Sequence, residues 1–185
     1  MKTMLRLALA VTLLPCLPAM AAPPGTQQLI GTFVGLAADE VHEGGPLEQR
    51  DIVMELRPYR ETGLQLEWHN VTLVNGRRDV PGVKFRHDEV LLAPAPDRSF
   101  FLAQVGYDPF AEKRSLDAVA GDPLRWGVAA GDQLSLFSFA IHDDGTYELQ
   151  VTERRPAGNG VSLEFDRILD GQVVRRMTGR AVRAQ

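Results

Sequence analysis

Along most of the chain, hydrophobic and polar residues alternate with a period of two, which predicts strands rather than helices. The alternating segments are separated by short stretches rich in Gly, Asp and Asn, which are typical of turns. We therefore expect an all-β protein of nine or ten strands. The expected strands lie at 29–38, 50–58, 64–69, 83–92, 99–105 and 124–130, in a hairpin over 133–153, through 161–165, and at 172–183.

The first hairpin can be placed from its hydrophobic positions. Apolar residues occupy every second position of 52–56 and of 64–68, and both sets share one face only if the loop has an odd number of residues. Residues 61–63 supply a three-residue loop that ends in Gly. This register predicts that Leu56 lies opposite Trp68.

The same reasoning predicts a second hairpin around Asp143-Asp144-Gly145, which pairs hydrophobic residues with one another over 137–141 and 147–151. A turn near 157–160 then places Val151 opposite Phe165. We expect these apolar faces to point into the protein. The expected inward set is Leu56, Leu66, Trp68, Phe139, Leu149, Val151, Leu163 and Phe165.

Consecutive strands joined by short turns favour a single antiparallel up-and-down β-barrel of about 8–10 strands, because closure removes the exposed edges of an open sheet. A β-sandwich is the main alternative. One segment departs from the pattern: Asp108-Pro109-Phe110 followed by residues 111–119 predicts a short helix, with Asp108 as its N-cap and Pro109 at its first position. That helix is expected to act as a plug over one end of the core, or as a lid over a cavity.

The N-terminus has the features of a secretory signal. Lys2 and Arg6 precede an apolar run from Leu7 to Leu17, and the small residues Ala19 and Ala21 fit cleavage after Ala21. The expected organisation is a signal peptide at 1–21 and one barrel domain at 22–185, which predicts a periplasmic or secreted protein.

Composition narrows the function classes. Without the first 21 residues the chain has 18 basic and 24 acidic residues, a formal charge of −6, which gives no general attraction to nucleic acid. The single cysteine, Cys16, lies within the expected signal, so the remainder has neither a disulfide nor a thiol nucleophile. A lipoprotein would make Cys16 its first residue, but Pro15 stands where a lipobox has Gly or Ala. No segment after the signal is apolar for long enough to predict a membrane-spanning helix.

Residues Gly31-Thr32-Phe33-Val34-Gly35 resemble the Gly-x-Trp opening of lipocalins and related calycin barrels, with Phe33 in place of Trp. The length of the chain after the signal is also similar to that of exported bacterial barrels of this kind. The cysteines and the Thr-Asp-Tyr motif of secreted lipocalins are missing. The resemblance implies a barrel that holds a ligand, with the aromatic residue closing its floor, and it implies no particular ligand.

No hydrolase, nucleotide-binding or metal-binding signature is found, and no cofactor or metal is predicted. The histidines His42, His69, His87 and His142 lack ligand spacing, although two of them could meet in space. Structural or solvent-facing roles are expected for them, with haem ligation by one buried histidine as a minority reading. Turn geometry alone accounts for the acidic pair at 143–144. We therefore predict no catalytic residues.

Two arginines are the strongest candidates for a binding site. The inward positions of the strand through Phe165 continue to Arg167, and a three-residue loop at 169–171 would place Arg175 inward opposite Phe165. A two-residue Asp170-Gly171 turn would instead rotate Arg175 outward. Buried guanidinium groups need anionic partners, which makes the pair a candidate carboxylate-binding site.

The function expected from the sequence is therefore that an exported barrel binds a small apolar or amphiphilic molecule, with anionic molecules included. The candidate ligand-binding residues are Arg167, Arg175, Trp68 and Phe139. Two alternatives stay open. One is a non-enzymatic envelope protein that acts through its outer surface, as an inhibitor or assembly partner, and the other is an enzyme without a recognisable motif.

Overall fold

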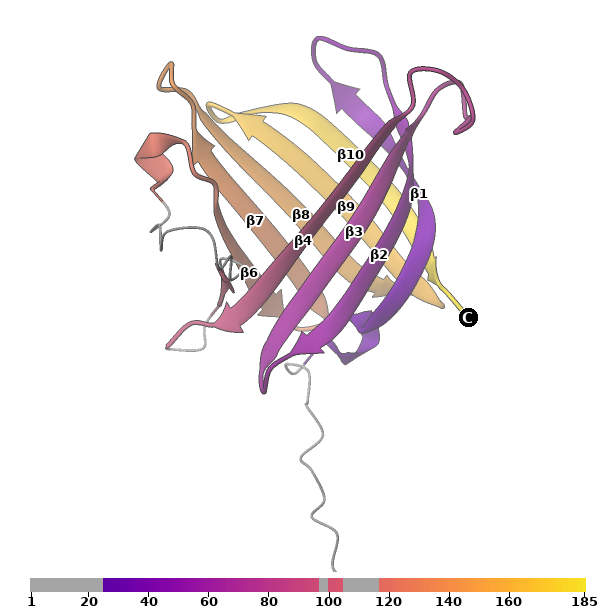
Figure 1. Cartoon of the computed structure of the whole chain (residues 1–185). Helices are drawn as coiled ribbons and strands as arrows, with labels where there is room; N and C mark the ends of the chain where they lie inside the picture. Colours follow the sequence, from indigo (N-terminus) through magenta and orange to yellow (C-terminus); the bar gives the residue numbers. More distant parts are fainter. Residues whose placement is uncertain (1–24, 97–99, 105–116) are drawn as a thin grey trace, which may run out of the picture.

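The ten strands form one closed antiparallel barrel in the computed structural model, which describes residues 25–96, 100–104 and 117–185 (Figure 1). Each strand pairs with the next in sequence, and β1 closes the barrel against β10, as expected for an up-and-down barrel and not for a sandwich. The strands are β1 (Gly31–His42), β2 (Gln49–Tyr59), β3 (Gly63–Leu73), β4 (Lys84–Pro94), β5 (Phe101–Gln104), β6 (Leu124–Ala130), β7 (Gln133–Ile141), β8 (Tyr147–Ala157), β9 (Gly160–Leu169) and β10 (Gln172–Arg183).

The helices within the described residues are two short 3-10 turns, η1 (Gln27–Leu29) and η2 (Ala118–Ala120). Most of the helix expected at 111–119, including its cap at Asp108, lies outside the described residues. The expected signal peptide at 1–21 lies outside them as well.

The β2–β3 hairpin has the expected faces but a different register. Leu56 lies opposite Leu66, and Met54 lies opposite Trp68, so the pairing is displaced by two residues from the expected one. The reason is that Arg60, with a φ of 52°, takes the left-handed position of the turn. Gly63 belongs to β3, where a Cβ atom would lie 2.3 Å from the carbonyl oxygen of Leu92. An even displacement keeps every side chain on its expected face.

The β7–β8 hairpin has the expected pairing, with Phe139 opposite Leu149 and Phe137 opposite Val151. The next turn is different, because Ala157 pairs with Gly160 across two residues rather than three. Val151 therefore lies opposite Asp166, not Phe165, and the apolar faces of β8 and β9 are on opposite sides of the barrel wall.

The prediction that Phe139, Leu149 and Val151 point inward was consequently wrong. The buried residues Leu134 and Leu136 are at the alternate positions of β7 and belong to the core. The odd-numbered positions of β7 and β8 therefore form the outer wall. The other members of the expected inward set have the expected orientation, with Leu56 and Leu66 fully buried and Trp68 and Leu163 packed against the core.

The last hairpin has the two-residue turn Asp170-Gly171, between Leu169 and Gln172. A β-bulge between Val173 and Arg175 then adds one residue to β10, which restores the face that the short turn alone would reverse. Arg175 lies opposite Arg167, and both occupy inward positions.

An apolar core fills one end of the barrel, beside η1. Leu29 from η1 and Phe33 from β1 are fully buried in it, together with leucines of β2, β3, β4 and β7. The Arg183 guanidinium lies 4.7 Å from the centre of the Phe33 ring and donates hydrogen bonds to the carbonyl oxygens of Gln28 and Ile30. This end of the barrel is therefore closed.

Candidate functional site in the polar half of the barrel

The other half of the barrel interior is polar. It lies toward the turns that join β1 to β2, β3 to β4, β7 to β8 and β9 to β10. Many inward side chains here are partly exposed, including those of Asn70, Ser138, Gln150 and Thr152, whereas those of the apolar half are almost all buried. Solvent therefore reaches the interior from this end.

Basic groups outnumber acidic groups at the inward positions. Apart from Arg183 at the closed end, seven basic and four acidic side chains of the described residues occupy inward positions or, for Glu48, the rim beside them. The formal charge of the interior is therefore positive, although that of the chain is negative. The basic residues are Arg50, Lys84, Arg86, Arg125, Arg154, Arg167 and Arg175, and the acidic ones are Asp39, Glu48, Asp88 and Glu148.

Arg175 is held by two carboxylates. Its Nε and Nη2 atoms donate to the two oxygens of Asp39 at 2.8 and 2.7 Å, and Nη2 also donates to Glu48 at 2.7 Å. Burial alone would raise the pKa of Glu48, but hydrogen bonds from Arg175 and Arg50 outweigh it and lower the pKa to about 2. The charge of Arg175 is thus compensated within the protein.

Arg167 is also paired. Its Nε and Nη2 atoms donate to one Glu148 oxygen at 2.9 and 2.6 Å, while the Gln150 amide donates to the other oxygen at 2.6 Å. The structure therefore brings both sequence-predicted arginines to the polar half of the interior, and each already has an anionic partner there.

Arg154, on β8, differs from both. Arg154 is 4% exposed and lies between Leu134 and Leu163 on the neighbouring strands. Burial lowers the pKa of Arg154 to about 10, so the guanidinium stays charged at neutral pH. Its Nε atom donates to the Met54 sulfur at 2.9 Å, whereas its buried Nη1 atom has no hydrogen-bond partner. No ion pair joins Arg154 to any carboxylate of the described residues.

Aromatic side chains border this arginine. The guanidinium carbon lies 6.0 Å from the centre of the Trp68 ring, and Phe165 is at the next inward position of β9 after Leu163. The interior therefore offers a cation beside aromatic surface. Phe139 does not take part, because it lies on the outer wall and a molecule inside the barrel would not meet it.

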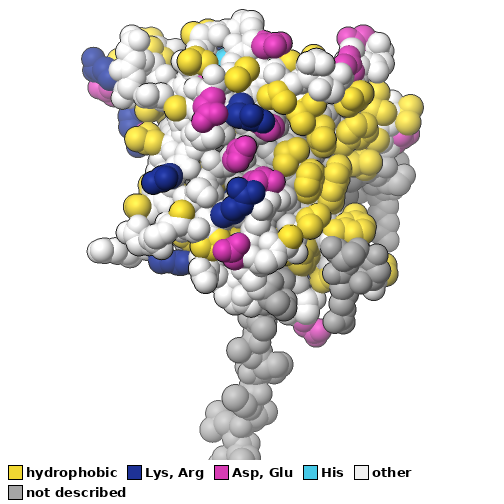
Figure 2. Space-filling view, turned by 180° about the vertical axis from the view of Figure 1, so that it is seen from behind, with side chains coloured by type: hydrophobic (Ala, Val, Ile, Leu, Met, Phe, Trp, Pro, Cys, Tyr) yellow, Lys and Arg dark blue, Asp and Glu magenta, His cyan; other side chains and the backbone are white. Residues whose placement is uncertain are grey.

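The outer wall over β6, β7 and β8 is apolar, and Figure 2 shows hydrophobic side chains gathered on one side of the barrel. Two pairs of aromatic rings lie on this surface. The rings of Trp126 and Phe137 stack with centres 5.1 Å apart, and those of Phe139 and Tyr147 are 6.0 Å apart. We call this surface, with Leu149 and Val151, the apolar outer wall.

Sequence reasoning missed Arg154 because it placed the even-numbered positions of β8 on the solvent side. The signal that could have found it is the alternation from Glu148 to Thr152, in which either face could be the inner one. A two-residue turn at Gly158-Asn159 would have decided between the two faces.

No family model matches the chain, and no curated protein matches it. The barrel is compatible with the lipocalin-like architecture that the opening of β1 implies. Within the part of the chain that the structure describes, no helix is both long and apolar enough to cross a membrane.

Proposed function

We propose that the protein is an exported barrel that binds a small organic anion in its interior, with the anionic group on Arg154 at the edge of the apolar core. The buried, unpaired guanidinium of Arg154 carries this proposal. A charged group removed from water without a partner is costly, and such groups in proteins are normally paired. A carboxylate, phosphate or sulfate group on a ligand would supply the missing partner.

The surroundings of Arg154 favour an anion that also has an apolar part. Trp68 and Phe165 offer ring surface on the same side of the wall, and an amphiphile would place its apolar portion against them. The positive formal charge of the interior attracts an anion from the open end.

Arg167 and Arg175 remain candidate ligand-binding residues, nearer than Arg154 to the turn between β9 and β10. Because both already hold carboxylates, a ligand anion would have to compete with Glu148, Asp39 and Glu48 for their donors. We therefore expect these arginines to contribute less to affinity than Arg154.

A titration with a fluorescent fatty acid tests this proposal. The protein beginning at Ala22 would carry Trp126→Phe, so that Trp68 alone reports on binding. We expect saturable quenching of Trp68 by the acid. Arg154→Gln should weaken binding of the acid by about 1.5–3 kcal/mol, roughly 10- to 160-fold, and should hardly change the binding of the methyl ester of the same probe. Arg167→Gln and Arg175→Gln should have smaller effects.

The outcomes separate the parts of the proposal. No saturable quenching in the protein with Arg154 intact would reject an interior site. Equal affinity for the acid with and without Arg154 would retain the site and reject the role of Arg154. Circular dichroism spectra and thermal unfolding of each variant would show that the barrel is intact.

The apolar outer wall favours a second candidate function, assembly with another copy of this chain. The outward positions of β7, and those of β8 from Tyr147 to Val151, carry no charged side chain, so two copies could meet there without charge repulsion. Sedimentation equilibrium should then show a dimer for the wild type and a monomer for Phe137→Asp. A monomeric wild type at concentrations near 1 mM would reject this function.

A further inference from the structure

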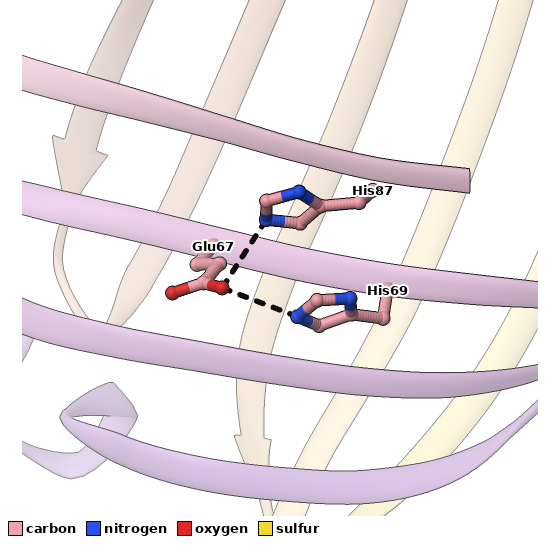
Figure 3. Close-up of side chains that lie close together, drawn as sticks. All are labelled: Glu67, His69 and His87. Carbon is pink, nitrogen blue, oxygen red and sulfur yellow. Dashed lines mark hydrogen bonds and ion pairs between the residues drawn. The ribbon is translucent and has the colours of Figure 1, made fainter.

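Two histidines that are far apart in the sequence meet on the outer wall of the barrel. His69 on β3 lies directly opposite His87 on β4, and their rings stack with centres 4.4 Å apart and planes 9° apart. Glu67 precedes His69 by two residues and is therefore on the same face of β3. Figure 3 shows the Glu67 carboxylate between the two ring nitrogens.

The three side chains converge on one point. One oxygen of Glu67, Oε1, lies 3.1 Å from Nε2 of His69 and 3.2 Å from Nε2 of His87. Ligand atoms of all three residues lie within 4.8 Å of one another. Two ligand atoms that share a metal ion at about 2.1 Å are about 3.0–3.4 Å apart, for coordination angles between 90° and tetrahedral. The two nitrogen–oxygen distances already have this spacing.

We propose that Glu67, His69 and His87 form a binding site for a divalent transition-metal ion such as Zn²⁺. Two imidazole nitrogens and one carboxylate oxygen are ligands that Zn²⁺ commonly takes in proteins, with the remaining position open to water or another small ligand. All three residues are partly accessible to solvent, so an ion can reach them from outside the barrel.

The charges around the site are favourable to a cation. Glu55 and Glu89 lie directly opposite Glu67 on the two neighbouring strands, which makes a row of three carboxylates across β2, β3 and β4. Arg57 is the nearest cation, and it lies 3.5 Å from Oε2 of Glu67, the oxygen that the histidines do not contact. Oε1 is thus left to the metal.

A second group of the same residue types provides an internal comparison. Asp39, His42 and Glu48 also bring their ligand atoms within 4.8 Å of one another. The Arg175 guanidinium, however, already occupies both oxygens of Asp39 and one of Glu48. A metal would have to displace it, so we expect no comparable binding there.

Isothermal titration calorimetry with Zn²⁺ tests the site, on untagged, metal-free protein beginning at Ala22 at pH 7.5. We expect one ion per chain. Affinity should fall at least about 10-fold in His87→Gln and in His69→Gln, and it should be unchanged in His42→Gln and His142→Gln, which serve as matched controls. With Cu²⁺, the electron paramagnetic resonance spectrum should show two coordinated imidazole nitrogens, reduced to one in His87→Gln.

Three results would overturn the proposal: no saturable Zn²⁺ binding by the wild type, equal affinity in wild type and His87→Gln, or a loss of binding in His42→Gln. Unchanged thermal unfolding of metal-free His87→Gln would show that the variant has kept its fold. The site is independent of the barrel interior, so its test is unaffected by the outcome for Arg154.

Discussion

The burial of Arg154 is expected to affect the stability of the barrel and its affinity for an anion in opposite ways. Arg154 is buried among apolar residues with no anionic partner in the described part of the chain. We expect this burial to make the ligand-free barrel less stable and to make the guanidinium a strong site for an anion. We therefore expect stability and binding to respond in opposite directions when this residue is replaced.

Arg154→Met keeps an unbranched chain of similar reach and removes the charge. In ligand-free protein, refolded from denaturant, this change should raise the free energy of unfolding by about 1–4 kcal/mol, because no unpaired charge is then buried. Urea denaturation measures the difference, with the exposed neighbour Arg155→Met as control. A loss of stability greater than about 1 kcal/mol would contradict our account of Arg154.

Glu48 is expected to make the free energy of unfolding depend on pH in the acidic range. Its folded-state pKa of about 2 is below the ordinary value of 4.5, so its contribution to stability is complete above about pH 4.5 and is lost as the pH falls toward 2. We expect the free energy of unfolding to fall less steeply over this window in Glu48→Gln than in the wild type. Denaturation curves at several pH values measure both slopes, and identical slopes would show that Glu48 is not responsible.

At the scale of the strands, local turn chemistry made several features predictable. Gly145 has a φ of 84° in the loop of the β7–β8 hairpin, where the sequence places it, and the pairing of that hairpin follows. Alternation also separates each strand into two faces. Alternation does not show which of the two faces points into the barrel. At β8 the inward face is mostly polar and the outward face is apolar from Tyr147 to Val151.

Long-range pairing explains what else could not be predicted. The contact between His69 and His87 depends on the register of β3 against β4. The Asn75-Gly76 turn in their connection pairs only Val74 with Arg77, and continuing its register would not place the two histidines opposite each other. The inward position of Arg175 depends on a bulge in β10 that offsets a two-residue turn. Neither feature has a local signature in the sequence.

The faces of β3 and β8 in the structure predict different costs for two leucines. Leu66 is fully buried in the core, so Leu66→Ala should lower the free energy of unfolding by about 2–5 kcal/mol. Leu149 lies on the half-exposed outer wall, and Leu149→Ala should cost less than about 1.5 kcal/mol. Chemical denaturation compares them, and a larger cost at Leu149 would mean that β8 is oriented the other way.

At the scale of the whole molecule, the barrel has one closed apolar end and one open polar end. This arrangement suits the proposed uptake of a small molecule from solution, and the N-terminal sequence predicts that the protein is exported. Barrel architecture was predictable from the number and spacing of the strands. The sign of the interior charge was not, because it depends on the faces of several strands together.

The predicted signal peptide implies a particular first residue for the exported protein. If residues 1–21 are a signal peptide, the protein isolated from its own host should begin at Ala22, since Ala19 and Ala21 fit the cleavage site. Mass spectrometry of the intact protein and N-terminal sequencing determine the first residue. A lipid-modified Cys16 at the N-terminus would contradict the prediction and would indicate a lipoprotein.

The most direct test of an anion site at Arg154 is native mass spectrometry of the protein purified from its own host. The account predicts that the wild type retains one small molecule that carries a carboxylate, phosphate or sulfate group, and that Arg154→Gln, purified in the same way, lacks it. A wild type at the mass of the bare chain, or the same molecule retained equally by Arg154→Gln, would contradict the account.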